Sequence, residues 1–434
     1  MKKTNIFLSF IAIATFVVAL AGCTKPKDGA EGAAGKDANE TCKLCHNANV
    51  VEAASTQYEL SKHSWGEAAF AEAGNTGCGP CHESEAFKYV CANNTPSTFT
   101  LSTTTNKWTN DYASVSTAAY GEISCFTCHS SLHSTYGSAD LPALTTVAPV
   151  SMTFFAGAKT INLTQDGGIS NLCVKCHQPR PFTASGQNGR ILNYDSLKNF
   201  PTDVFFDTTL TTNRLKPGYR THTHYGTIGA IYAGVGFAGI EFPGTLSYTN
   251  SKHTTETSCQ DCHMATVSGA AGGHTFKAEG NLNGCNVTDC HGAGTVTTSA
   301  TDPYLGAVKT EIKGLLGQLA AKLQQGGREI MNRNADATTN LWYGHTTNNY
   351  DGYLNIYDPI NNPTGSTTSF KANSTSGFSA AQIAFNNTLP KLMLTNAQFG
   401  SIINFQMCLR EYSLGIHNYK YTKALLTNSI AILP

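Results

Sequence analysis

Cys173-Val174-Lys175-Cys176-His177 is a five-residue run in which two cysteines, two residues apart, are followed directly by a histidine. The same spacing occurs four more times in the chain, and a sixth motif has four residues between its cysteines. The six motifs contain twelve of the 15 cysteines, so one repeated pattern accounts for most of the cysteine content. The other five motifs are Cys42/Cys45-His46, Cys78/Cys81-His82, Cys125/Cys128-His129, Cys259/Cys262-His263 and Cys285/Cys290-His291.

The spacing of these motifs predicts covalently bound haem. Two thiols so placed can add to the two vinyl groups of one porphyrin, and the next residue brings an imidazole to the iron. A two-residue gap corresponds to one helical turn, whereas the four-residue gap of the sixth motif requires a looped-out backbone. Zinc sites and disulfide frameworks also use paired cysteines, but neither needs a histidine after every second cysteine. We therefore expect six haems c, with iron ligands His46, His82, His129, His177, His263 and His291.

The second axial position of each iron is expected to take one of the eight remaining histidines. His133 follows His129 by four residues, so on a helix the two imidazoles share a face and serve different irons. His63 and His253 share a Ser-Lys-His context near a motif, and His274 follows two glycines that let a flat macrocycle approach the backbone. Methionine is a weaker candidate, because the haem segment contains only Met152 and Met264. These counts favour bis-histidine haems of low potential.

Two sets of histidines leave the ligand assignment open. His222 and His224 point to opposite sides if their segment is extended, so we expect one to bind iron, with His224 preferred, and the other to support a haem propionate. His417 lies between two helical stretches and is also a candidate. His345, in a loop rich in tyrosine and asparagine, is expected to be structural.

The first residues indicate export and lipid anchoring. Lys2 and Lys3 precede an apolar run, and Leu20-Ala21-Gly22-Cys23 looks like a bacterial lipobox. We expect a signal peptide at residues 1–22, a lipid on Cys23 and a flexible tether of glycine and alanine at residues 23–41. An ordinary secretory signal or a retained membrane anchor is the alternative. Thr24 favours the outer membrane, facing the periplasm or the cell surface.

The charge balance argues against a nucleic-acid partner. The chain has 29 basic and 29 acidic residues, and no basic stripe runs along it. The expected partners are instead other redox proteins or an extracellular electron acceptor, and an oligomer or polymer is conceivable. The membrane would be contacted through the lipid.

The expected fold class is mainly α with much irregular structure and a few short strands. Residues 42–295 are expected to form a hexahaem domain organised by its macrocycles, with strands within residues 95–120 and 147–163. Residues 296–434 are expected to form an antiparallel helical unit packed on that domain. Its helices are predicted from a cap at Asp302-Pro303 through Leu323 to Gly326-Gly327, from Ala380 to Leu394 with a break at Pro390, and from Ala397 to Ile432. Cys91 and Cys408 are left over, and a disulfide between them is one possibility.

Three stretches of the chain resemble the multihaem cytochromes c of anaerobically respiring bacteria. The first surrounds Cys173 to Gln178, and the second runs from His222 to His274. The third, from Asn404 to Asn418, is similar to the closing helices of pentahaem nitrite reductases. The resemblance covers residues 42–434 and implies electron transfer through closely packed haems. It also implies that His417 is a distal ligand and that His222 or His224 is spare.

Two functions follow from these expectations. The first is an electron conduit in anaerobic or extracellular respiration, which needs no catalytic residue. The second is a reductase of small nitrogen or sulfur oxyanions at one five-coordinate haem. Nitrite reductases of this kind have a catalytic motif that ends in lysine, whereas all six motifs here end in histidine, which favours the conduit. Anion-binding candidates for the reductase are Arg180, Arg190, Arg214, Arg220 and Tyr225, although arginines also pair with propionates.

Overall fold

The structure is a computed structural model in which helices and irregular segments predominate and strands are short. Within its described residues, no helix is long and apolar enough to cross a membrane. The expected signal peptide, Cys23 and most of the tether lie outside these residues. The described residues are 38–65, 78–92, 99–101, 108–110, 122–130, 132–155, 158–180, 182, 192–207, 217, 221–325, 328–333, 350–354 and 393–434.

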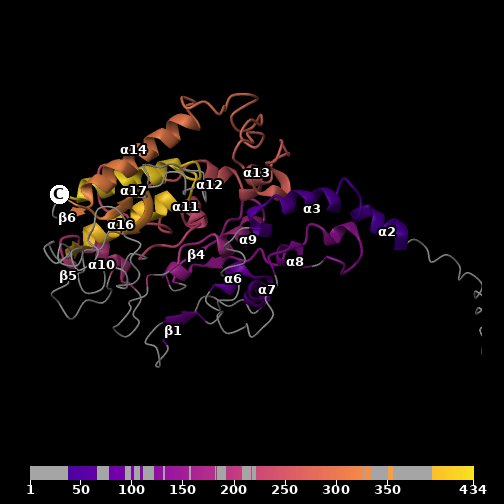
Figure 1. Cartoon of the computed structure of the whole chain (residues 1–434), viewed down its shortest axis with the longest axis horizontal. Coiled ribbons are helices and arrows are strands. Elements are labelled where there is room, and N and C mark those ends of the chain that lie inside the picture. Colours follow the sequence, from indigo (N-terminus) through magenta and orange to yellow (C-terminus); the bar gives the residue numbers. More distant parts are fainter. Residues whose placement is uncertain are drawn as a thin grey trace, which may run out of the picture.

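Five of the six cysteine motifs lie on short helices (Figure 1), as a two-residue gap between cysteines predicts. Two of these helices begin with a capping box directly before the first cysteine, because Ser124 and Ser258 each exchange hydrogen bonds with the residue three positions later. The sixth motif, Cys285 to His291, lies in a succession of turns, which agrees with the looped-out backbone expected there. The motif helices are α2 (Ala38–Cys45), α6 (Gly79–His82), α8 (Cys125–Cys128), α9 (Ile169–Cys176) and α13 (Cys259–His263).

Further short helices connect the motifs. Helix α3 packs against the 3₁₀-turn that contains His274, and α7 packs against α6 and α8. Helix α3 therefore joins the part of the chain after the first motif to the part after the fifth, and α7 joins the second motif to the third. They are α3 (Val51–Glu59), α4 (Lys62–Trp65), α7 (Ser84–Ala92), α12 (His253–Glu256) and the 3₁₀-turns Ser138–Asp140, Thr153–Phe155 and Gly273–Thr275.

The described strands form five two-stranded antiparallel sheets. The first two sheets lie within residues 95–120 and 147–163, so the prediction of short strands there is confirmed. The sheets are β1 (Phe99–Leu101) with β2 (Trp108–Asn110), β3 (Val150–Ser151) with β4 (Thr160–Ile161), β5 (Val204–Asp207) with β10 (Met393–Thr395), β6 (Gln324–Gln325) with β7 (Arg328–Glu329), and β8 (Met331–Arg333) with β9 (Tyr350–Leu354).

The C-terminal part of the chain forms a helical layer at the opposite end of Figure 1 from α2. It consists of α14 (Gly306–Lys322), α16 (Asn396–Arg410) and α17 (Tyr419–Ile432), with α10 (Tyr194–Asn199) and α11 (Ile228–Ala233) packed on α16. Helices α16 and α17 pack on each other and are joined by only residues 411–418, so they run antiparallel. His417 lies in this connection, between two helices as predicted.

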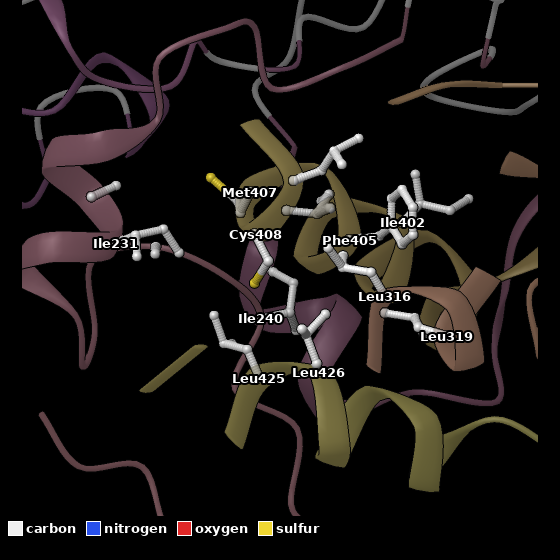
Figure 2. Close-up of a cluster of buried hydrophobic side chains, with 14 of the residues drawn as sticks. Ile231, Ile240, Leu316, Leu319, Ile402, Phe405, Met407, Cys408, Leu425 and Leu426 are labelled. Atoms are coloured by element: carbon white, nitrogen blue, oxygen red, sulfur yellow. The ribbon is translucent and has the colours of Figure 1, made fainter. Parts of the chain in front are cut away.

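A large hydrophobic core joins the helical layer to the segment that carries the fourth motif. Figure 2 shows Leu316 and Leu319 of α14, Phe405 of α16 and Leu426 of α17 among its members. Buried apolar residues between Val150 and Phe242 belong to the same cluster. The segments before and after residue 295 therefore share one core. Burial of this apolar surface stabilises the fold by roughly 25 cal/mol for each square ångström removed from water.

The two leftover cysteines do not pair. Cys408 is fully buried in the core of Figure 2, whereas Cys91 is half-buried on α7, and both have free thiols. The possible disulfide between them is therefore absent. Every described cysteine of the six motifs is likewise a free thiol, available for another bond.

Two local predictions were wrong. Helix α14 begins at Gly306 rather than after Asp302, because the Asp302 carboxylate accepts hydrogen bonds from the backbone N–H groups of Tyr304 and Leu305 and closes a separate turn. Met393 and Leu394, predicted to end a helix, form strand β10; most of that predicted helix lies outside the described residues. The helical pattern from Ala397 to Ile432 is interrupted at residues 411–418, around His417 as expected, and Tyr412, Leu414 and Gly415 have positive φ there.

Candidate metal centres

Each motif histidine faces a histidine from outside the motifs, and no histidine is used twice. The six pairs combine segments that lie far apart in the sequence. Five of the six distances between ring centroids fall within half an ångström of one another. The pairs are His46–His133 at 5.7 Å, His82–His224 at 6.4 Å, His129–His274 at 6.3 Å, His177–His63 at 6.0 Å, His263–His417 at 6.1 Å and His291–His253 at 6.0 Å.

These distances match the space that a metal ion between two imidazoles requires. A bond from a metal to an imidazole nitrogen is about 2 Å long, so nitrogens on opposite sides of one metal are about 4 Å apart and the ring centres about 6 Å. The Nε2 atoms of His46 and His133 are 3.4 Å apart, so this pair would open by roughly half an ångström to admit a metal. The donor set therefore fits a group that takes one nitrogen on each of its two faces.

Three of the paired histidines use their Nδ1 atoms in hydrogen bonds. Nδ1 of His263 lies 2.9 Å from the carbonyl oxygen of Phe276, and Nδ1 of His253 lies 2.8 Å from that of Ile416. Nδ1 of His417 lies 2.5 Å from Oε2 of Glu411. Because these acceptors fix the proton on Nδ1, they leave Nε2 of each ring as a free lone pair, which is how metal-binding histidines are usually held.

Glu411 is a fully buried carboxylate in the connection between α16 and α17. It accepts hydrogen bonds from Nδ1 of His417, from Oγ of Ser413 at 2.6 Å and from the backbone N–H of Gly415 at 2.9 Å. Burial alone would raise the pKa of Glu411, but hydrogen bonds from His417, Ser413 and Gly415 hold the pKa below its usual value. This connection therefore presents an anion to one member of one pair.

Burial keeps several paired imidazoles neutral, which is the form that binds a metal. Desolvation is the main cause that lowers the pKa of His177 to about 3 and of His224 to about 2, with nearby histidines adding to it for His177 and Arg180 for His224. Burial also lowers the pKa of His63, His263, His274 and His291.

Neighbouring motifs are in direct contact. The thiol of Cys176 hydrogen-bonds to Cys81 of the second motif, and the thiol of Cys173 hydrogen-bonds to Cys259 of the fifth. The fourth motif therefore lies between the second and the fifth. A group bound at one of these motifs would lie next to a group bound at another.

Phe276 connects three of the pairs. Its ring contacts His63 at 5.0 Å and His274 at 5.8 Å between centroids, and its carbonyl oxygen accepts from Nδ1 of His263. The residue has a φ of 54°, a left-handed conformation that is unusual for a bulky side chain and indicates a tightly determined position. The pairs of the third, fourth and fifth motifs therefore each contact Phe276, two through its ring and one through its carbonyl oxygen.

An open cavity lies beside His129, at the third motif. Its volume is about 300 Å³, and its walls include Lys88, Cys91 and Phe126 in addition to His129. Ligand and cofactor pockets commonly have volumes of roughly 300–1,000 Å³, so this cavity lies at the lower end of that range.

The histidines left open by the sequence have distinct positions. His224 faces His82, whereas Nδ1 of His222 accepts hydrogen bonds from Arg410 at 2.6 Å and from the backbone N–H of His224 at 2.8 Å. The two rings are nearly parallel, 6.2 Å apart, so they do not point to opposite sides as an extended segment would place them. His224 itself has a positive φ of 75°.

His133 and His129 belong to different pairs, as expected, but they do not lie on one face of a helix. Helix α8 ends at Cys128, and His133 has a φ of 65°, so a turn rather than a helical face separates the two imidazoles. The sequence-based argument from helical spacing was therefore wrong here.

Arg410 was missed by the sequence analysis. It is almost fully buried at the end of α16, and its guanidinium lies 4.3 Å from the ring centre of Tyr225 and 5.0 Å from that of Tyr353. The hydroxyl groups of these two tyrosines hydrogen-bond to each other. A charged residue inside an apolar helical stretch was the available signal, because a buried charge needs partners.

The residues expected to bind an oxyanion are only partly described. Arg180 donates a hydrogen bond to Sγ of Cys78 at 3.3 Å, and Tyr225 lies under Arg410. Both are near the His82–His224 pair. Arg190, Arg214 and Arg220 lie outside the described residues, and so does His345.

Among the described residues, no three histidine, cysteine or acidic side chains converge as ligands of a bare metal ion. The recurring unit is a pair of imidazoles with a pair of thiols nearby in the sequence. Comparisons with models of protein families, with curated proteins and with solved structures found no match to this chain.

Proposed function

We propose that this protein is an electron carrier that holds six haems c, each with two histidine ligands. The observation that carries the proposal is the one-to-one pairing of six motif histidines with six others, at ring separations of 5.7 to 6.4 Å. A haem supplies four nitrogens to its iron and a one-electron couple, so the chain needs to add only one imidazole on each face. The two cysteines before each proximal histidine attach the macrocycle covalently.

The pairing favours the conduit over the reductase. A reductase of the kind considered needs an iron with one open face, and hence a motif histidine that lacks an opposing ligand. All six motif histidines are described, and each has an opposing imidazole. The chain's residues would then exclude water and substrate from every iron and only tune its potential.

Contacts between motifs support transfer of electrons from one centre to the next. The thiols of Cys81 and Cys176 meet, as do those of Cys173 and Cys259, and Phe276 touches two pairs and accepts a hydrogen bond from a third. Close spacing of centres is the physical requirement for hopping between them. Together with the lipobox, this arrangement fits a carrier tethered by lipid at Cys23 to the outer membrane, exchanging electrons with other redox proteins or an extracellular acceptor.

The test uses the mature protein from a host that attaches haem c. We expect its intact mass to contain six haems and its ferric spectrum to be entirely low-spin, unchanged by nitrite or hydroxylamine. A mass without six haem increments would disprove the cofactor assignment. A high-spin fraction that shifts with nitrite or hydroxylamine would instead support the reductase.

A further inference from the structure

The His263–His417 pair differs from the other pairs in its surroundings. Both of its Nδ1 atoms have hydrogen-bond acceptors: the neutral carbonyl of Phe276 for His263 and the carboxylate of Glu411 for His417. His253, in another pair, also uses Nδ1, but its acceptor is the neutral carbonyl of Ile416. Of these three acceptors, Glu411 is the only one that carries a charge.

The connection between α16 and α17 is built to hold this carboxylate. Ser413 and Gly415 both donate to Glu411, and the backbone N–H of His417 donates to Oγ of Ser413 at 3.0 Å. Glu411 has no exposed side-chain surface and His417 only 18%. Water therefore screens their interaction little, and a short hydrogen bond to a buried anion makes the imidazole a stronger electron donor.

We propose that Glu411 is a positioning residue that lowers the midpoint potential of the iron bound by His263 and His417. This inference rests on the proposed function. A more basic imidazole stabilises ferric iron over ferrous iron, so the one-electron reduction of this centre becomes less favourable.

The first experiment compares the haem-loaded protein with the Glu411→Gln variant. Glutamine keeps the size and an oxygen acceptor for Nδ1 but removes the charge. We expect one of the six midpoint potentials to rise by at least about 59 mV, which corresponds to a tenfold change in the ferric-to-ferrous equilibrium. Potentiometric titration followed by paramagnetic resonance measures this shift. The shift should be confined to one low-spin signal.

Two further variants separate charge from disturbance of the fold. Glu241→Gln removes a carboxylate that accepts from Tyr421 of α17 at 3.1 Å but contacts no paired histidine, so all six potentials should stay unchanged. Ser413→Ala disturbs the same connection but leaves the carboxylate, so no potential should rise. A rise in Ser413→Ala equal to that in Glu411→Gln would overturn the proposal.

The outcomes also separate this inference from the proposed function. If Glu411→Gln carries six haems and all six potentials equal those of the unmodified protein, the role of Glu411 is wrong and the carrier remains. If the unmodified protein lacks six haems, the proposed function itself fails.

Discussion

His63 faces His177 with 6.0 Å between the ring centroids, although the second and third cysteine motifs separate the two residues in the sequence. His63 lies on α4, and His177 follows α9. The pair therefore ties the beginning of the described chain to its middle. Because the other pairs also join distant segments, the histidine pairs form only when the whole chain is folded.

Replacing His63 with alanine should create one open iron. In the proposed carrier, the His177 iron would lose its second imidazole while its thioether bonds keep the haem in place. We expect one of six haems to become high-spin and to bind carbon monoxide in the ferrous state, measured by optical and paramagnetic-resonance spectra. Six low-spin haems in this variant would contradict the pairing of His63 with His177.

His222 and His224 should respond differently to the same substitution. His224→Ala removes the imidazole that faces His82 and should make one haem high-spin. His222→Ala removes an acceptor of Arg410 and of the His224 N–H but no imidazole that faces a motif histidine, so all six haems should stay low-spin. The reverse result, with a high-spin haem only in His222→Ala, would show that the assignment of the two residues is inverted.

Asn404 should be important for stability, independently of any cofactor. Its side chain accepts from the backbone N–H of Ile240 at 2.6 Å and donates to the carbonyl of the same residue at 2.8 Å, all within the core. Asn404→Ala should lower the free energy of unfolding by about 1–3 kcal/mol for each buried group left unpaired, measured by guanidinium denaturation. Asn199→Ala, at an exposed position of α10, is the matched control and should change it by less than about 0.5 kcal/mol.

Cys408 should be unreactive in the folded protein and should make folding sensitive to high pH. Burial raises the pKa of its thiol well above the ordinary value. Below the unfolded pKa of about 8.5 both states keep the proton; above it only the unfolded state loses the proton, so stability falls as the pH rises. Iodoacetamide at pH 8 should modify Cys408 only in denaturant, as read by mass spectrometry of peptides. Modification under native conditions would contradict its burial.

The spacing of the motifs was enough to predict one part of the structure. A two-residue gap between cysteines corresponds to a helical turn, and Cys173 and Cys176 lie on α9 as predicted. The four-residue gap between Cys285 and Cys290 was correctly expected to need an irregular loop. Such features depend on residues adjacent in the sequence, so local stereochemistry determines them.

The partner of each motif histidine could not be predicted in the same way. His253 lies six residues before Cys259 yet faces His291, and His274 faces His129 rather than the nearby His263. These choices depend on how distant segments pack, and no local pattern encodes them. The contact between Glu411 and His417 could not be predicted for the same reason. Ser413, Gly415 and His417 surround Glu411 only after the chain turns between two helices.

The connection between α16 and α17 has a consequence for biogenesis. It supplies the imidazole of His417 to one centre and the Ile416 carbonyl that orients His253 at another. In the proposed carrier, a nascent chain that ends with α16 at Arg410 would contain all six attachment motifs but would lack both of these groups. Haem attachment could therefore begin in such a chain, whereas the fifth and sixth centres of the proposed carrier would need the connection between α16 and α17 to be complete.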